Sequence, residues 1–599
     1  MNNATNQGKM RADGAYLKML ACLVILGLLG YGFAVVGLFS GWLINILTVA
    51  LLGAMIMYLY RFLRDESTFT RVIFLISVAV SCIVLYGVEP FLFSGRDQGA
   101  IAEAAITLSK TGSLRSASEL SEALFGIYGP GKALHYPGFH YTLSGELVTQ
   151  FPVGTIAFFA VFTSLFGASG LILANGLLLL LSLFTLYLLV RVLSDTQYAV
   201  GAFLIGCVSF LPLWAARLTL SENIFLFFFL GLSYTLIRFL SRPDRNTFLL
   251  ALGAGALLAA LRIEGVFAFL ATVGILVFSP SGKAFLARKR ADFLLSSLVA
   301  ALLFLALNLA ANLPLYRSIL GATFDHMFAV STGETGIFTA LLLWPLFASY
   351  GLLLPFALGL VGIILLLVHR KWLALIPALL ALPAFLFFLD PNISPDHPWM
   401  LRRFLFSLWP ALLISLSIAL HHILGNARDA LRSQIITGAL FAIVCIASLP
   451  PTISSVSFRE YDGLSDQTAQ LADRIGPNDL LLLDREATGD PYAIPAAPLR
   501  LGHDRNAVYF FNPADYEKLP RDSFEHVYLL APEQNVETLW SDLSATLTPI
   551  ETVRFSFDRI HPAPLSDPAF PSRETVTTES TLYRLDSPLL PIPSPAESI

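Results

Sequence analysis

The residue best placed to do chemistry in this sequence is Asp97, in the segment Arg96-Asp97-Gln98. An apolar run precedes it, and residues 98–109 after it have the apolar spacing of a helix. A carboxylate at a helix start has a simple structural role as an N-cap. It has a chemical role if it takes a proton from an attacking hydroxyl group. The sequence leaves both roles open.

Six further ionisable residues lie at the ends of apolar runs, two by two: Arg217 with Glu222, Arg262 with Glu264, and Arg402 with Arg403. Ionisable groups at membrane depth are costly, so they face a polar cavity or one another. Each Arg–Glu pair is therefore either a local salt bridge between helix ends or part of a cationic site. Several arginines on one face would suit an anionic lipid head group such as a phosphate.

The remaining motifs are only weak evidence for a metal, disulfide or nucleotide site. His135 and His140 are separated by Pro137 and Gly138, so they lack the i,i+4 spacing of helical metal ligands. The four cysteines lie in apolar runs, which favours neither a disulfide framework nor a zinc site. No nucleotide or dinucleotide fingerprint is present in a plausible context.

The composition shows what must position these residues. Of 599 residues, 56% are hydrophobic and 13% charged, against about 25% charged in ordinary soluble domains. This excludes a soluble enzyme and a disordered chain. The first 450 residues have a net charge of +8 and residues 451–599 a net charge of −12. The pattern predicts a polytopic α-helical membrane body followed by a water-soluble domain.

The body contains about thirteen apolar runs that suit membrane-spanning helices. Residues 1–70 form an N-terminal transmembrane hairpin, and residues 71–450 form the main body. The run 153–166 is short and is expected to be re-entrant or interfacial. Residues 246–278 are either two helices or one long one, and the run 338–368 is either one span or two spans divided at Pro345 and Pro355.

The distribution of lysine and arginine indicates the orientation of the chain in the membrane. With the N-terminus inside, the inner segments hold 18 of these residues and the longer outer segments hold 9, which fits the positive-inside rule. An odd number of spans then places the C-terminal domain outside, on the same face as the long loop 94–152. The chain is thus expected in a plasma membrane, the inner membrane of a bacterium, with its N-terminus cytoplasmic.

Both outer parts are expected to be ordered. In the loop 94–152, helices are predicted over 98–109 and 118–125. The segment 451–599 is predicted to be an α/β domain with an accessory role. Its expected strands are 480–484, 507–511, 526–530, 552–557 and 581–585, and its expected helices are 465–475, 513–519 and 536–544.

The layout resembles that of the C-type (GT-C) glycosyltransferases, and most of all the bacterial relatives of protein O-mannosyltransferases and aminoarabinose transferases. Residues 96–103, RDQGAIAE, are similar to the group's Asp-Glu…Tyr-Ala-x-x-Ala segment. Residues 150–154, QFPVG, are similar to the proline-rich start of its amphipathic helix, and Arg403-Phe404 with Pro410 to its Arg-Tyr…Pro segment. Gln98 and Ile101 depart from the group's second acid and tyrosine.

The resemblance implies transfer of a hexosyl or pentosyl group from a polyprenyl-phosphate donor to a glycan, lipid or protein acceptor on the extracytoplasmic face. It makes Asp97 the general base. It makes a set of residues candidates for the donor phosphate and sugar: Arg96, Arg217, Glu222, Arg262, Arg402 and Arg403. Glu103 and Gln98 would support them.

No cofactor is predicted, and a divalent metal is not favoured, because the second acid of the motif is missing. No nucleic-acid partner is expected. Two other functions stay open: a transporter or lipid flippase, which should show paired repeat halves, and a non-catalytic envelope assembly protein.

Overall fold

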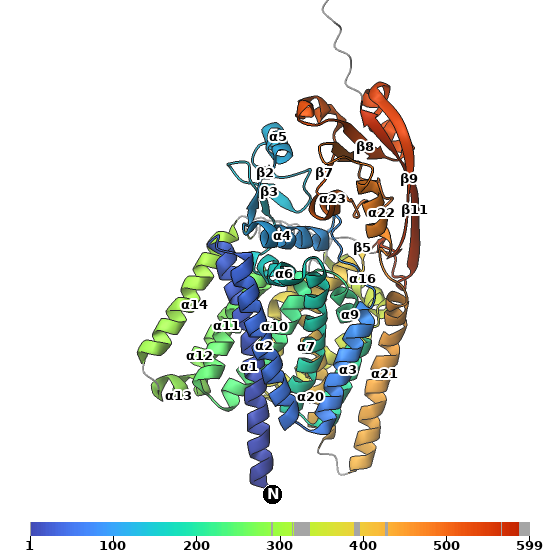
Figure 1. The fold of residues 1–599 in the computed structure, drawn as a ribbon. Helices are drawn as coiled ribbons and strands as arrows, with labels where there is room; N and C mark the ends of the chain where they lie inside the picture. Colours follow the sequence, from blue (N-terminus) through green and yellow to red (C-terminus); the bar gives the residue numbers. More distant parts are fainter. Residues whose placement is uncertain are drawn as a thin grey trace, which may run out of the picture.

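The computed structural model describes residues 2–288, 291–313, 316, 336–388, 396–425, 429–564 and 566–585. It has two layers: a body of long apolar helices, and a mixed α/β domain that covers one end of that body (Figure 1). The N-terminus lies at the opposite end of the body (Figure 1). Parts of two segments that the charge count assigns to the outer face, 314–337 and 391–403, lie outside the described residues, as do the last residues of the predicted C-terminal domain.

Six described helices are long and apolar enough to span a membrane. They are α1 (Asn2–Val35), α2 (Gly41–Asp65), α3 (Thr68–Leu85), α7 (Ser169–Leu193), α10 (Ser221–Ser241) and α21 (Ala430–Val456). Four bent helix pairs raise the number of candidate spans to as many as ten. These include α8 (Thr196–Val208) with α9 (Phe210–Ala216), α12 (Ile263–Phe278) with α13 (Pro280–Arg288), α16 (Gly336–Ser349) with α17 (Leu353–Val368), and residues 399–405 with α20 (Leu408–Leu424).

The expected count of about thirteen is therefore not confirmed. Several apolar runs form helices shorter than a full span: α11 (Arg245–Leu261), and α18 (Ile376–Leu380) followed by the 3-10 helix η1 (Leu382–Phe388). Apolar α14 (Ala291–Ala311) lies at the edge of the body (Figure 1), where its Asn308 donates a hydrogen bond to the carbonyl oxygen of Ala259 in α11.

The breaks between helices decide two questions that the sequence left open. Residues 246–278 are two helices, because Arg262 between α11 and α12 is extended, with φ −155° and ψ 155°. The run 338–368 bends by 117° between its two prolines. Gly351 lies at that bend with φ +68°, and a Cβ there would come within 2.5 Å of Ser448 Cα. Only glycine fits this position.

The loop 94–152 is ordered, as predicted. Its helices are α4 (Asp97–Thr111) and α5 (Glu119–Tyr128), and the side chain of Ser118 caps α5. A four-stranded sheet that the sequence did not predict completes the loop, in the order β1 (Arg115–Ser116), β4 (Leu147–Thr149), β3 (Phe139–Tyr141) and β2 (Gly131–Lys132). Helix α4 and the apolar α6 (Val153–Phe166) lie across the ends of the long helices (Figure 1).

The C-terminal domain begins after α21, which continues through Pro450 and Pro451 to Val456. Its five-stranded sheet has the order β7 (Asn506–Tyr509), β6 (Leu480–Leu483), β8 (Val527–Ala531), β11 (Arg573–Leu585) and β9 (Leu547–Ile560). The first three strands are parallel and the last two antiparallel. All five predicted strands fall on this sheet, and β6 is buried along its whole length, as its leucine run indicated.

Helices α22 (Leu464–Ala472) and α23 (Ala496–His503) accompany the sheet, and the second of these was not predicted. The predicted helix 513–519 is a 3-10 turn, η3 (Pro513–Lys518). The predicted helix 536–544 is divided between α24 (Glu533–Thr538) and η5 (Ser541–Thr546). Strand β10 (Ala563–Pro564) pairs with β5 (Asp396–His397), so the domain adds a strand to a segment of the body.

Candidate active site

Asp97 is the first residue of α4, and its Oδ2 forms an ion pair with Arg402 of the short helix α19 (Arg402–Leu405). The N-cap of α4 is Arg96, and no side chain caps this helix. The N-cap interpretation of Asp97 is therefore wrong. The Asp97 side chain is 36% exposed, whereas that of Arg402 is only 8% exposed. Within the described part of the chain, only one oxygen of Asp97 is bonded.

Glu222 connects Arg402 to a second arginine. It lies in the first turn of α10, and its Oε1 is 2.9 Å from Arg262 Nη1 and 3.5 Å from Arg402 Nη1. Arg262 also binds Glu264 through two nitrogens, at 3.1 and 2.9 Å. The local Arg262–Glu264 bridge is thus confirmed, but Arg262 reaches beyond it to another helix. Four segments far apart in the sequence meet here.

Arg403 completes this charge cluster, which we define as Asp97, Glu222, Arg262, Glu264, Arg402 and Arg403. Its guanidinium carbon lies 5.7 Å from the centre of the Phe387 ring. No described carboxylate lies within ion-pair distance of Arg403, although Asp97 and Glu222 both act on it electrostatically. A half-buried cation without a direct partner is costly unless an anion joins it.

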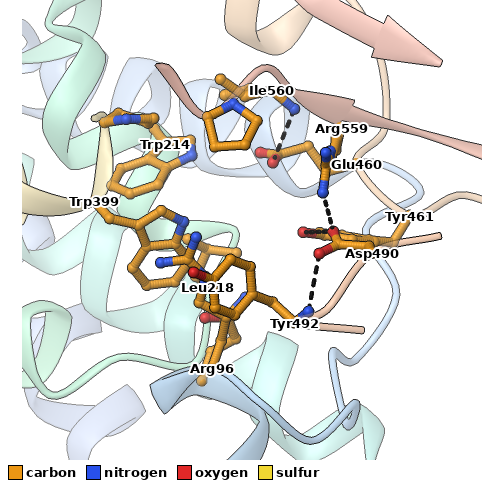
Figure 2. A pocket seen from close by; sticks show the side chains of 13 residues that line it. Arg96, Trp214, Leu218, Trp399, Glu460, Tyr461, Asp490, Tyr492, Arg559 and Ile560 are labelled. Carbon is orange, nitrogen blue, oxygen red and sulfur yellow. Dashed lines mark hydrogen bonds and ion pairs between the residues drawn. The ribbon is translucent and has the colours of Figure 1, made fainter. Parts of the chain in front are cut away.

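Arg96 and Gln98 flank Asp97 but face the C-terminal domain. Arg96 Nη2 lies 2.6 Å from Asp396 Oδ2, and its guanidinium lies 4.5 Å from the Trp399 ring and 3.7 Å from the Tyr492 ring (Figure 2). Gln98 is fully buried. Arg96 therefore joins the body to the C-terminal domain rather than entering the charge cluster.

Two predicted residues lie elsewhere. Arg217 donates hydrogen bonds of 2.7 Å to the carbonyl oxygens of Ser455 and Phe458, so the expected Arg217–Glu222 bridge is not formed. Glu103 forms an ion pair with Arg500 of the C-terminal domain. Both residues hold the two layers together.

The C-terminal domain brings residues to the site that the sequence did not indicate. Glu460, Asp490, Tyr492 and Arg559 line a pocket with Arg96, Gln98 and Trp399 (Figure 2). Desolvation raises the pKa of the Glu460 carboxyl group, and the charge of Arg217 offsets this in part. No pattern in residues 451–599 marked these side chains, because they come from loops that are far apart in the sequence.

The charge cluster does not fit a divalent cation. Such ions need several free oxygen ligands, but Asp97, Glu222 and Glu264 each bind a guanidinium. Among the described residues, the one grouping of possible metal ligands is Asp479, Glu525 and His526, in the C-terminal domain. His135, which lacks metal-ligand spacing in the sequence, is bonded to the carbonyl oxygen of Tyr509.

No protein-family model matches this sequence, and no curated protein matches it either. Among solved structures, the chain is similar to ArnT from Cupriavidus metallidurans bound to undecaprenyl phosphate. The identity is 14% over 86% of this chain and 99% of that one, with a TM-score of 0.49. It is also similar to the archaeal oligosaccharyltransferase AglB from Archaeoglobus fulgidus, in complex with an inhibitory peptide and a dolichol-phosphate. There the identity is 12% over 79% of this chain and 70% of that one, with a TM-score of 0.43.

At such identities and TM-scores the likeness is distant. The chemistry of the site therefore rests on the residues of this chain.

Proposed function

We propose that the protein transfers a sugar from a polyprenyl-phosphate donor to an acceptor hydroxyl group, with Asp97 as the general base. One observation carries the proposal. Asp97 is partly exposed and pairs with Arg402 in a cluster where Arg403 has no described carboxylate partner. A base for a hydroxyl group and cations for a phosphate are thus combined in one place.

The step needs one proton acceptor and one stabilised leaving group. The free oxygen of Asp97 takes the proton of the acceptor hydroxyl as that oxygen attacks the anomeric carbon. The bond from this carbon to the phosphate oxygen breaks, and polyprenyl phosphate leaves with the electron pair. Attack from the face opposite the phosphate inverts the anomeric configuration.

The arginines stabilise the leaving phosphate. Arg402 and Arg403 are adjacent on α19, and Arg402 pairs with Glu222, which Arg262 holds in place by a second ion pair. Cations fixed before the reaction stabilise developing charge without a cost of reorganisation. Glu222 therefore serves to position arginines rather than to bind the sugar directly.

The reaction is proposed to occur on the extracytoplasmic face of a plasma membrane. The C-terminal domain and α4, which begins at Asp97, lie at one end of the body, and the N-terminus lies at the other (Figure 1). The excess of lysine and arginine in the N-terminal-side loops supports this orientation. A protease added to intact spheroplasts should release the C-terminal domain; full protection would contradict the topology.

The test of the activity compares purified wild type with Asp97→Asn. Each is given undecaprenyl-phosphate-linked sugars and a pool of envelope acceptors, and product formation is followed by mass spectrometry. We expect transfer to fall by about 10²–10⁴-fold, with undecaprenyl phosphate still bound. Glu146→Gln is the matched control, because Glu146 belongs to the same loop but pairs with Arg115 at the surface.

Equal transfer by both proteins would remove Asp97 as the base. No turnover with any donor would favour the transporter, flippase or assembly functions. Loss of transfer on adding a chelator, with recovery on adding a divalent cation, would overturn the metal-independent mechanism.

A further inference from the structure

A second feature lies beside the start of α4. It is a polar pocket between the start of α4, the segment around Trp399, and two loops and the end of β9 in the C-terminal domain (Figure 2). Gln98, Glu460, Asp490 and Tyr492 are among the residues that line it. Both layers of the molecule therefore contribute to one cavity.

Gln98 is the unusual member of this lining. Its side chain is 0% exposed, and neither its amide oxygen nor its amide nitrogen has a hydrogen-bond partner among the described residues. A buried amide without partners costs free energy, and native proteins rarely keep one without a reason. An amide offers a donor and an acceptor together, which matches a hydroxyl group or two neighbouring hydroxyl groups.

The walls around Gln98 are held in place by their own contacts. Asp490 binds Arg559 at 2.7 Å and the backbone nitrogen of Tyr492 at 2.9 Å (Figure 2). Tyr492 and Trp399 hold the Arg96 guanidinium between their rings. The pocket is thus built before any ligand arrives. Trp214 Nε1 and Glu460 Oε1, which also line it, lack a described hydrogen-bond partner too, but only Gln98 has both an unpaired donor and an unpaired acceptor on one side chain.

The pocket adjoins the proposed base. Gln98 follows Asp97 directly in α4, and the Trp399 ring lies near both Arg96 and Arg402, at 4.5 and 5.4 Å. The pocket therefore adjoins the charge cluster through Trp399 and through the start of α4. We expect an acceptor to approach the cluster from this pocket if the donor phosphate binds the arginines.

We infer that this pocket binds hydroxyl groups of a carbohydrate acceptor through Gln98, an inference that rests on the proposed glycosyl transfer. The free space inside is little more than that of one water molecule. It therefore admits the hydroxyl-bearing edge of a sugar, with the ring itself at the mouth beside the aromatic walls. The C-terminal domain is then part of the acceptor site.

The test uses full-length protein in detergent and a panel of methyl glycosides, with binding followed by saturation-transfer NMR. We expect at least one glycoside to bind the wild type, and Gln98→Leu to weaken that binding by about threefold to tenfold, the loss of one hydrogen bond. Gln98→Met, of similar size, should behave in the same way. Asp97→Asn should keep the binding.

A stability measurement separates binding from a structural role. Leucine removes the unpaired amide, so Gln98→Leu should keep or raise the melting temperature. Gln467→Leu is the control, because Gln467 binds the backbone of Ser556 at 2.8 and 2.9 Å, and its loss should lower the melting temperature without changing glycoside binding. A lower melting temperature for Gln98→Leu would show that the amide has structural partners and would overturn the inference.

Two further outcomes are decisive. No bound glycoside in the wild type, or equal binding by Gln98→Leu, overturns the acceptor pocket. Binding of undecaprenyl phosphate in the same samples is measured separately: if it persists, the proposed transfer survives the failure of the pocket. Glycoside binding without any binding of undecaprenyl phosphate would instead contradict the proposed donor.

Discussion

Two networks of ion pairs lie at opposite ends of the helical body. We call a network closed when each of its arginines has a carboxylate of its own, and the two networks differ in this respect. At the N-terminal end, Arg191 binds both oxygens of Glu66, at 2.7 and 2.9 Å, and Arg238 pairs with Asp13. Each arginine there has its own carboxylate. In the charge cluster at the other end, Glu222 is shared by two arginines and Arg403 has no described carboxylate partner.

The exposure of the side chains also differs between the two networks. The side chains of Arg191 and Glu66 are 14% and 7% exposed, whereas Asp97 is 36% exposed beside an almost buried Arg402. A closed pair satisfies its own charges and ties helices together. An open cluster keeps capacity for an anion and for a proton, so it is the one suited to chemistry.

Of the effects that distinguish the two networks, the largest is expected in the rate of sugar transfer. Arg403→Met should lower transfer by about 10²–10³-fold, because one preorganised charge at the leaving phosphate is lost. Undecaprenyl phosphate should also bind more weakly. Arg191→Met, in the closed network, should leave the turnover of the folded enzyme unchanged. A similar fall in both variants would show that the two networks do not differ in function.

The loss of folding stability should show the reverse order, with the larger loss in Arg191→Met. Arg191→Met leaves Glu66 buried without its partner, so it should cost about 3–5 kcal/mol. Arg403→Met removes a cation that has no direct partner and should cost less than about 1 kcal/mol. Denaturation of the purified variants, followed by the fluorescence of tryptophan, measures both. A more unstable Arg403→Met would mean that Arg403 has a structural anion.

The smallest effect concerns the contact between body and C-terminal domain. His397 lies 2.7 Å from the Tyr350 hydroxyl and 2.6 Å from the carbonyl oxygen of Asp567. Burial lowers the pKa of His397, in part against the nearby charges of Asp396 and Asp567. The neutral imidazole therefore stabilises the contact above the pKa of the unfolded chain, about 6.5, and this stability is lost as the pH falls through the lower, folded pKa.

The protection of the β5 and β10 amides, measured as exchange relative to the intrinsic rate at each pH, should thus fall as the pH is lowered from 7.5 to 5.5. His397→Gln keeps a donor for Asp567 but does not titrate, so its exchange should lose this extra pH dependence. An unchanged dependence in the variant would assign the effect to other groups, such as His561.

Much of the fold followed from local patterns. The two helices of the loop 94–152 were predicted by apolar spacing, and the strands of the C-terminal sheet by short apolar runs. The number of spans was less certain, since a run of apolar residues does not show where a helix bends. Gly351 and the extended Arg262 mark two such bends, and each depends on contacts with a distant segment.

The site was predictable only in its parts. Asp97 and the arginines stood out because charge is rare in apolar surroundings. Their partners did not follow, since neighbours in sequence suggested Arg217 with Glu222, whereas the fold brings Glu222 to Arg262 and Arg402. Trp399, Asp490 and Tyr492 carried no signal, because aromatic and acidic residues are common in such loops.

The sequence by itself determined that this chain has an apolar helical body, an ordered loop after the third run and an acidic α/β domain. These follow from hydropathy and periodicity, which are local properties of the chain. Only the tertiary structure decided which charges pair, which arginine has no described carboxylate partner, and that the C-terminal domain lines a pocket beside Asp97. Such choices depend on the three-dimensional meeting of residues up to several hundred positions apart, which no local pattern encodes.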